Sequence, residues 1–326
     1  MHQTSKDNIP VSDPPIPIID ITPLVSKDVK QEGVVNEIRD VCEAVGFFYV
    51  VGHGISLDVQ AKIFSIAREF FALPDRTKQS VGVVKSRCFR GYVPFALTGP
   101  NVPKRMLEAF QMMLDLGSDD PDVAGENIMY GSNQWPEGIP RMRSILEAYY
   151  KEMETLSNHL LSAFALALGE DRAFFNAYFH KPLTQLRLLH YPYVASDNPE
   201  DQQGVEPHTD TGAFTILMQD DIGGLEVKAR DGSWLSASPI EDAFVINVGD
   251  MMQWWTADKF VSTPHRVTNR SGRSRYSVPF FVNPDRSAVI TRLGADPDDT
   301  RERFDVGAHV EKAYVDAWPR DPAGVG

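Results

Sequence analysis

Two short stretches of the sequence carry side chains that could bind one metal ion together. His208 and Asp210 stand two residues apart in "PHTDTGAFTILMQDD", and 54 residues separate Asp210 from His265 in "STPHRVTNRSGRSRYSVPFF". Alternate residues of a strand point to the same side, so His208 and Asp210 can share an ion. His265 starts another predicted strand and can supply a third ligand from across a β structure. We therefore interpret these three residues as a metal site.

The ligand set indicates which chemistry the metal would support. Two imidazoles and one carboxylate on one face of an octahedron form the facial triad of non-haem Fe(II) oxygenases, which leaves open positions for a co-substrate and O2. The same three ligands also suit zinc, which typically keeps one position for water. A non-redox metal protein therefore stays open as an alternative. The His-x-Asp pair alone is a weak signal, because 45 acidic residues make chance pairs common.

A second pair of polar residues strengthens the metal interpretation. Arg275 and Ser277 follow His265 by ten and twelve residues, again at alternate positions of a predicted strand. An arginine that points into an apolar interior is unfavourable unless it is paired. Residues 266–284 contain no acidic residue, so a ligand carboxylate is the expected partner. The guanidinium fork would bind it in bidentate fashion, with the Ser277 hydroxyl as a further donor.

The elements that must position these residues are short strands framed by helices. Residues 183–285 show seven strand-like runs between turn signals, which favours a sandwich or a jelly-roll barrel. Apolar residues at helical spacing predict one long helix near 139–170. We expect a mainly β fold with helical support, built on a double-stranded β-helix (jelly-roll) core. The expected layout is a flexible arm at 1–15, an N-terminal α+β region at 16–120, a linking segment with the long helix at 121–182, the core at 183–290 and a C-terminal segment at 291–326, all in one catalytic unit.

Bulk properties exclude several classes of function. The chain has 326 residues, of which 42% are hydrophobic, and a formal net charge of -13. Such an acidic surface repels phosphate backbones and anionic lipids, so we expect neither nucleic acid nor a membrane as a partner. The N-terminus lacks an apolar signal-peptide segment. Cys42 and Cys88 make no disulfide framework, which fits a reducing compartment. We predict a cytoplasmic protein.

At this point the sequence resembles a known family. The stretches "HTDTGAFTILMQDDIGGLEV", "GDMMQWWTADKFVSTPHRV" and "RYSVPFF" look like the isopenicillin-N-synthase-like branch of the 2-oxoglutarate/Fe(II)-dependent dioxygenases. Upstream, "IPIIDITPL", "VGFFYVVGHGI", "REFFALP", "RGYVPF", "NQWP" and "LRLLHYP" extend the resemblance over about residues 16–285. It implies an enzyme that uses Fe(II), 2-oxoglutarate and O2. The implied reaction oxidises an unactivated C–H bond, by hydroxylation, desaturation or ring closure.

The resemblance also implies roles for individual residues. His208, Asp210 and His265 match the family's Fe(II) ligands. Arg275 and Ser277 match the Arg-x-Ser that binds the distal carboxylate of 2-oxoglutarate, and Tyr191 matches a tyrosine that often contacts co-substrate or substrate. Leu189 departs from the asparagine that many plant members carry at that position. Isopenicillin N synthase has the same Arg-x-Ser without using 2-oxoglutarate, so an oxidase of that kind stays open as an alternative.

Substrate contacts are harder to assign from the sequence. We name Arg90 and Tyr92 in "FRGYVPF" and Phe110 and Met112 in "EAFQMMLD" as candidates. A cation such as Arg90 would suit a substrate carboxylate. The expected substrate is a small metabolite, an amino-acid-derived or other natural-product intermediate that bears a carboxylate. No obligate protein partner is evident.

Overall fold

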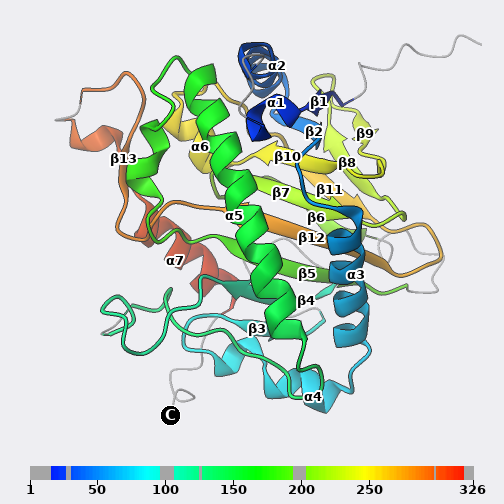
Figure 1. The fold of residues 1–326 in the computed structure, drawn as a ribbon. Helices are drawn as coiled ribbons and strands as arrows, with labels where there is room; N and C mark the ends of the chain where they lie inside the picture. The colour runs from blue at the N-terminus through cyan, green and yellow to red at the C-terminus, as the bar shows by residue number, and fades with distance from the viewer. Residues whose placement is uncertain are drawn as a thin grey trace, which may run out of the picture.

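The computed structural model describes residues 16–26, 31–95, 106–124, 127–193, 203–296 and 299–318. The predicted flexible arm at 1–15 lies outside the described residues. Within them, strands form a central sheet and a smaller one, and helices cover the outer side of the central sheet (Figure 1). The expected fold, mainly β with helical support, is confirmed.

The central sheet unites strands from both ends of the described chain. Its eight strands follow the order β1-β2-β10-β7-β12-β5-β4-β3, and every pairing is antiparallel except β1 with β2. Strands from the N-terminal region thus flank those of the predicted core. The bounds are β1 (Ile18–Asp20), β2 (Phe47–Val51), β3 (Gly91–Val93), β4 (Glu108–Met113), β5 (Gln185–Tyr191), β7 (Phe214–Gln219), β10 (Phe244–Val248) and β12 (Arg275–Val282).

A smaller sheet carries two of the three predicted metal ligands. Its order is β6-β11-β8-β9. One cavity is lined by residues of both sheets, so the two sheets face each other across it. Among the described residues the hydrogen-bonded ladders do not close into a continuous barrel, which corrects the barrel alternative. The bounds are β6 (Gln203–His208), β8 (Leu225–Lys228), β9 (Trp234–Ser236) and β11 (His265–Thr268), and a separate pair is β13 (Val289–Thr291) with β14 (Arg303–Asp305).

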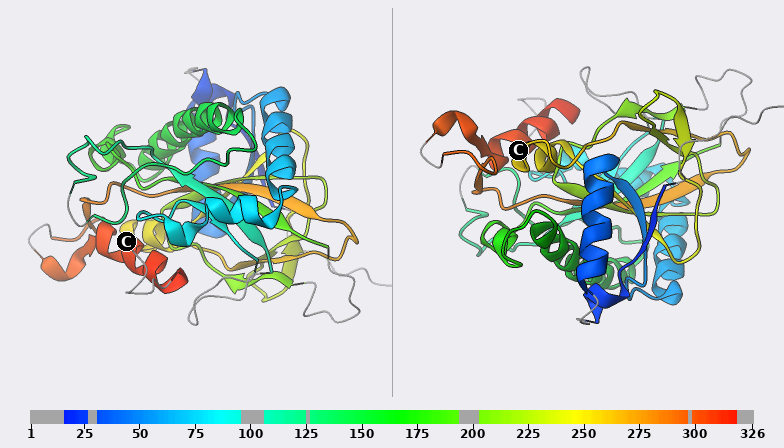
Figure 2. Two further views of the ribbon diagram at one scale, coloured as in Figure 1. Left: turned by 90° about the horizontal axis from the view of Figure 1, so that it is seen from below. Right: turned by 90° about the horizontal axis from the view of Figure 1, so that it is seen from above.

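The helices lie on two sides of this β structure. Figure 2 shows α2, α3 and α5 on one side of the central sheet and α7 on the other side, with the smaller sheet. None of the described helices combines the length and the apolar character that a membrane crossing requires. The α-helices are α1 (Thr22–Val25), α2 (Gln31–Ala44), α3 (Leu57–Phe71), α4 (Asp75–Ser80), α5 (Met142–Ala167), α6 (Asp250–Trp255) and α7 (Val306–Ala317), and the 3-10 helices are η1 (Val83–Lys85), η2 (Phe174–Tyr178) and η4 (Thr300–Glu302).

Helix α5 is the long helix that the sequence predicts, three residues shorter at each end. Its apolar stripe packs on the outer face of the central sheet, where Tyr150 meets Phe280 at a ring distance of 5.1 Å and Phe164 meets Phe214 at 5.2 Å. Such edge-on aromatic pairs add to the burial of large apolar surfaces. Helix α5 therefore covers the outer face of the central sheet, and the inner face of the sheet lines the cavity.

Strand alternation sorts side chains between these two faces. On β12, Arg275 and Ser277 line the cavity, whereas Phe280 packs under α5. On β5, Tyr191 lines the cavity, while the neighbouring His190 points to the outer face and contacts Glu108 at 2.8 Å. This period of two is what brings polar residues of separate strands to one surface.

Candidate active site

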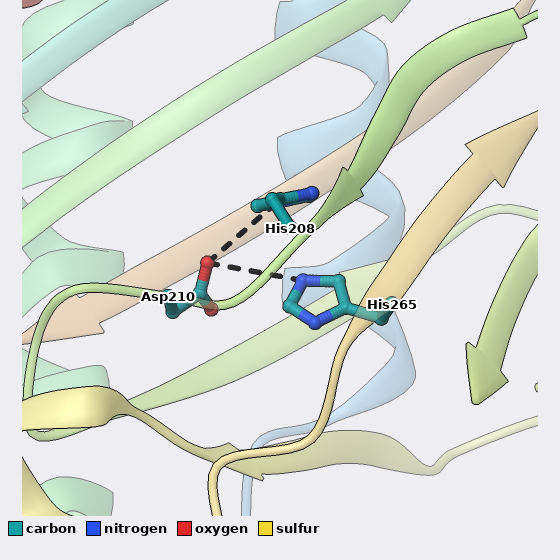
Figure 3. A group of neighbouring side chains, drawn as sticks. All are labelled: His208, Asp210 and His265. Carbon is teal, nitrogen blue, oxygen red and sulfur yellow. Dashed lines mark ion pairs between the residues drawn. The ribbon is translucent and has the colours of Figure 1, made fainter. Parts of the chain in front are cut away.

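The three predicted metal ligands point toward one another (Figure 3), and all three line the cavity. His208 ends β6 and His265 begins β11, and the two are directly paired across these antiparallel strands. Asp210 lies two residues beyond the end of β6, so it reaches the site from the loop that follows and not from the strand that the sequence predicted. Asp210 Oδ1 is 3.8 Å from Nε2 of each histidine. All three ligand atoms lie within 4.8 Å of one another.

Each imidazole is oriented by its second ring nitrogen. His208 Nδ1 lies 2.8 Å from the carbonyl of Glu206, and His265 Nδ1 lies 3.2 Å from that of Thr263. A carbonyl only accepts hydrogen bonds, so Nδ1 is the protonated nitrogen of each neutral ring. The lone pair of each Nε2 is then directed at the common centre. This is the arrangement that metal-binding histidines normally show.

The Asp210 carboxylate is held through its other oxygen. Oδ2 accepts hydrogen bonds from the Thr215 hydroxyl at 2.6 Å and from the Asn247 amide at 2.7 Å. Burial acts to raise the pKa of Asp210, but the two imidazoles and these hydrogen bonds together lower that pKa below its ordinary value. Oδ1 is therefore an ionised oxygen that remains available to a cation.

The donor set fits Fe(II). One carboxylate oxygen and two imidazole nitrogens supply three ligands, and the cavity that these residues line has room for further ligands. A dication would also relieve the crowding of three polar side chains in a largely buried site. The residues present thus match the group that the facial-triad interpretation requires.

Arg275 is a buried charge beside this site. Its side chain is fully buried, and its guanidinium donates to the Gly223 carbonyl at 2.6 Å, the Ser277 hydroxyl at 3.0 Å and the Gln219 side chain at 3.4 Å. The Tyr191 ring lies 4.9 Å from the guanidinium carbon. Among the described residues no carboxylate lies within ion-pair distance of Arg275, although the buried Asp220 carboxyl is near enough to interact with it electrostatically. A buried arginine in such surroundings calls for an anionic ligand.

The cavity that joins these groups has a volume of about 530 Å3. This lies within the range of about 300–1,000 Å3 typical of small-molecule sites. Most of its wall is apolar, with leucine, valine and aromatic side chains from both sheets and from α7. The metal-site residues, Arg275, Ser277 and Tyr191 all line it.

Comparisons with known proteins agree with this site. Residues 182–284 match the sequence model of the 2OG-Fe(II) oxygenase superfamily, and residues 16–138 match that of the "non-haem dioxygenase in morphine synthesis N-terminal" family. The chain is 34% identical to the 2-oxoglutarate-Fe(II) type oxidoreductase hxnY of Emericella nidulans, over 82% of this chain and 80% of that protein. It is 37% identical to the 2-oxoglutarate-dependent dioxygenase citB of Monascus ruber, over 87% and 90%.

A solved structure shares the whole architecture. A full-length Neurospora crassa protein, crystallised in complex with alpha-KG and thymine, superposes with a TM-score of 0.79 at 28% identity, and the match covers 91% of this chain and 96% of that one. The chain belongs to the 2OG-Fe(II) oxygenase superfamily. This oxygenase is accordingly an oxidoreductase that uses Fe(II), 2-oxoglutarate and O2, as predicted.

The proposed substrate contact at Arg90 is not supported by its position in the oxygenase. Arg90 is fully buried away from the cavity lining, and its guanidinium donates to the carbonyls of Cys88 and Met129. Tyr92 also lies outside the cavity, where its hydroxyl donates to Glu108 at 2.7 Å. Both side chains serve the packing of β3 and cannot touch a molecule in the cavity.

The other two substrate candidates lie on the wrong face of the sheet. Phe110 and Met112 do not line the cavity, and the Phe110 ring packs on Phe70 of α3 at 4.9 Å. The intervening residue Gln111 faces inward instead, in register with Arg187 of β5. Polarity gave no sign of which face is which, because the buried polar residues of β4 lie on both faces, Glu108 on the outer and Gln111 on the inner one; no residue of β4 lines the cavity.

Sequence reasoning also missed residues that hold the site in place. Thr215 and Asn247 fix Asp210, and Gln219 contacts Arg275. Asn247 did carry a signal, because it is the polar residue of the otherwise apolar strand "AFVINV". Gln185 and Arg187 of β5, which also line the cavity, carried a weaker signal: they are polar residues at alternate positions of "LTQLRLLHYP".

Proposed function

We propose that His208, Asp210 and His265 hold Fe(II), and that Arg275 and Ser277 bind the distal carboxylate of 2-oxoglutarate beside the Tyr191 ring. The observation that carries this proposal is the fully buried Arg275 in the same cavity as three convergent ligands. A dicarboxylate can neutralise that cation with one end and reach the metal with the other. We further propose that the oxygenase belongs to the isopenicillin-N-synthase-like branch and acts in the cytoplasm.

When bound, iron and 2-oxoglutarate supply the reduction of O2 and the oxidation of a substrate C–H bond, with succinate and CO2 as co-products. The residues of the chain would position the metal and the co-substrate. The carbonyls at Glu206 and Thr263 keep both imidazoles in the metal-binding tautomer. Arg275 and Ser277 set the orientation of the co-substrate. The apolar wall excludes water, which strengthens the charge interactions inside the cavity.

The proposed substrate is a small metabolite, an amino-acid-derived or other natural-product intermediate, which the oxygenase hydroxylates, desaturates or closes into a ring. Support comes from the size and apolar character of the cavity. A screen of metabolites for substrate-stimulated succinate release tests this part. Mass spectrometry of the products then distinguishes a gain of oxygen from a loss of two hydrogens.

The co-substrate assignment is tested with Arg275→Leu. We expect this variant to need at least about 30-fold more 2-oxoglutarate, because loss of one partner of a buried charge pair weakens binding by about 2–5 kcal/mol. The readout is an anaerobic titration of the Fe(II) protein that follows the weak visible band of the Fe(II)–2-oxoglutarate complex.

The matched control is Arg273→Leu, two residues earlier in the chain. Arg273 is exposed and pairs with Asp221 at 3.3 Å, away from the cavity. Its variant should titrate like the natural protein. An Arg275→Leu protein with unchanged 2-oxoglutarate affinity would remove Arg275 from the site.

A further inference from the structure

Two buried amide side chains line the cavity, and each keeps one polar atom without a hydrogen-bond partner. Gln185 of β5 is 5% exposed, and Asn283, the residue after β12, is 6% exposed. Within the described residues, Gln185 Nε2 has no acceptor and Asn283 Oδ1 has no donor. Buried polar atoms in native proteins are nearly always paired, because an unpaired one is unfavourable. One donor and one acceptor in the same cavity therefore point to a ligand that satisfies both.

The two side chains are neighbours on the inner face of the central sheet. Gln185 lies across from Phe281 of β12, and Asn283 is two residues beyond Phe281. All three residues line the cavity, as alternate residues on one face of a sheet can. Diagonal neighbours of this kind lie roughly 7–8 Å apart. One small polar group of a ligand can therefore contact both side chains at once.

The Asn283 amide is fixed from its other side. Its Nδ2 donates to the Leu183 carbonyl at 3.2 Å, which leaves Oδ1 as the acceptor. Gly212 lies against this oxygen, because a Cβ at Gly212 would be 2.4 Å from Asn283 Oδ1 and its three nearest atoms would all belong to Asn283. The glycine thus leaves room for the amide. Since Gly212 follows Asp210 by two residues, Asn283 Oδ1 lies beside the loop that carries this metal ligand.

Helix α7 covers the same part of the cavity. His309 Nε2 lies 3.2 Å from the carbonyl of Thr211, the residue before the glycine. Further along the helix, the Tyr314 hydroxyl lies 3.7 Å from Met113 Sδ, and Met113 is in register with Gln185. Between these two contacts the helix lines the cavity with Val310, Lys312 and Ala313. The two amides are thus enclosed by protein, where a hydrogen bond is stronger than in open water.

The two amides lie far from the residues assigned to 2-oxoglutarate. Asn283 is six residues beyond Ser277, and Gln185 is six residues before Tyr191. Each separation is roughly 20 Å at the rise of a β-strand. A molecule as short as 2-oxoglutarate does not span this distance when its distal carboxylate is bound at Arg275. The unpaired donor and acceptor therefore belong to the site of a different molecule.

The hydrogen-bonding needs of the two atoms select the class of ligand. A carboxylate only accepts hydrogen bonds, so it would leave Asn283 Oδ1 unpaired, and an ammonium group only donates, so it would leave Gln185 Nε2 unpaired. An amide carries a carbonyl oxygen and an N–H side by side, which is the complement of one donor and one acceptor.

We propose that Gln185 and Asn283 bind a carboxamide group of the substrate. Gln185 Nε2 donates to the carbonyl oxygen of this group, and Asn283 Oδ1 accepts from its N–H. The rest of the substrate extends across the inner face of the sheet toward the iron ligands. This inference rests on the proposed function for the oxidation of that substrate, but not for the binding of the amide.

The test compares amides with analogues that lack the N–H. The full chain, loaded anaerobically with Fe(II) and 2-oxoglutarate, is titrated in a calorimeter with phenylacetamide, 3-phenylpropanamide and 4-phenylbutanamide. The corresponding methyl esters keep the carbonyl oxygen without the N–H, and the corresponding carboxylates carry acceptors only. We expect at least one amide to bind the natural protein roughly 5- to 100-fold more tightly than its ester and its carboxylate, because only the amide pairs both buried atoms.

Two variants should change this pattern in different ways. Gln185→Met keeps the length of the side chain without the donor, so it should weaken amide and ester by a similar factor, roughly 5- to 100-fold. Asn283→Leu removes the acceptor, so it should lower the affinity for the amide to that for the ester and leave the ester unchanged. A purely structural role of the two residues would not produce this dependence on the ligand. Gln79→Met, a matched change of an exposed glutamine of α4 outside the cavity, should bind all probes as the natural protein does.

Circular dichroism shows whether each variant is folded, and where one of the two is not, the other decides. The absence of amide binding by the natural protein, an ester or carboxylate that binds as tightly as its amide, or an amide preference that survives in Asn283→Leu would each overturn the proposal. So would unchanged affinities in Gln185→Met, or loss of the fold in both variants. A natural protein that forms no Fe(II)–2-oxoglutarate band but still prefers amides would instead refute the proposed function and leave the amide site supported.

Discussion

Glu108 and Arg275 are both buried charged residues, but they differ in the groups that surround them. Glu108 accepts from Lys78 at 2.8 Å and from Tyr92 at 2.7 Å, and His190 lies 2.8 Å from its other oxygen. It is therefore fully satisfied within the protein, on the outer face of the central sheet. Arg275 has only neutral partners among the described residues. A buried charge that hydrogen-bonds only to neutral groups and forms no ion pair within the described residues is the one that indicates a ligand site.

The Glu108 cluster makes a prediction for acid stability. Burial acts to raise the pKa of Glu108, but the hydrogen bonds from His190, Lys78 and Tyr92 lower it to about 2, from 4.5. Because this pKa is depressed in the folded state, the stabilisation is present above pH 4.5 and is lost as the pH falls toward 2. After allowance for solvent screening it amounts to at most about 3 kcal/mol. The difference in unfolding free energy between the natural protein and Glu108→Gln should thus shrink by about half between pH 7 and pH 3 in urea titrations. A difference that is constant with pH would contradict the assignment.

At the scale of elements, the sequence predicts some helices and strands better than others. Helix α5 is predictable because its apolar residues recur at helical spacing along one face. The start of α3 is predictable because it carries a capping residue: Ser56 Oγ accepts a hydrogen bond from Val59 N at 3.3 Å. Strand β4 was not, since all six of its residues are buried. A one-residue error in its parity sends every side chain to the opposite face. That error placed Phe110 and Met112 on the inner face of the sheet, although no residue of β4 lines the cavity.

The turn between α2 and β2 gives a prediction for one element boundary. Gly46 has a φ of +64°, and a Cβ there would lie 1.8 Å from the Val261 carbonyl oxygen. Gly169, which follows α5, has a φ of +81° and nothing within 4 Å of such a Cβ. Gly169→Ala should lower the free energy of unfolding by about 1–2 kcal/mol, the strain of a left-handed residue. Gly46→Ala should lower it by about 2–5 kcal/mol, because the backbone must also move. Urea denaturation of both variants measures this, and equal losses would refute the steric argument.

At the scale of the whole molecule, the site depends on contacts between distant parts of the chain. Residue types and spacing were enough to name His208, Asp210 and His265 and to expect a buried arginine with them. The pairing of β4 with β5, which makes one sheet of the N-terminal strands and the core, leaves no local trace in the sequence. Neither does the approach of α7 to the cavity, where Trp318 faces Arg187. These placements follow from tertiary packing, so they were visible only in the structure.

The most direct test of the proposed site is the binding of Fe(II) to the natural protein and to His265→Ala. In anaerobic equilibrium dialysis, the natural protein should bind one equivalent of Fe(II) and form the visible band when 2-oxoglutarate is added. His180→Ala, which removes an exposed histidine outside the cavity, should do the same. His265→Ala should remain folded by circular dichroism, bind no iron at equimolar metal and show no band. A His265→Ala protein that keeps one equivalent of Fe(II) and an unchanged band would contradict the convergence of these three side chains on a single ferrous ion.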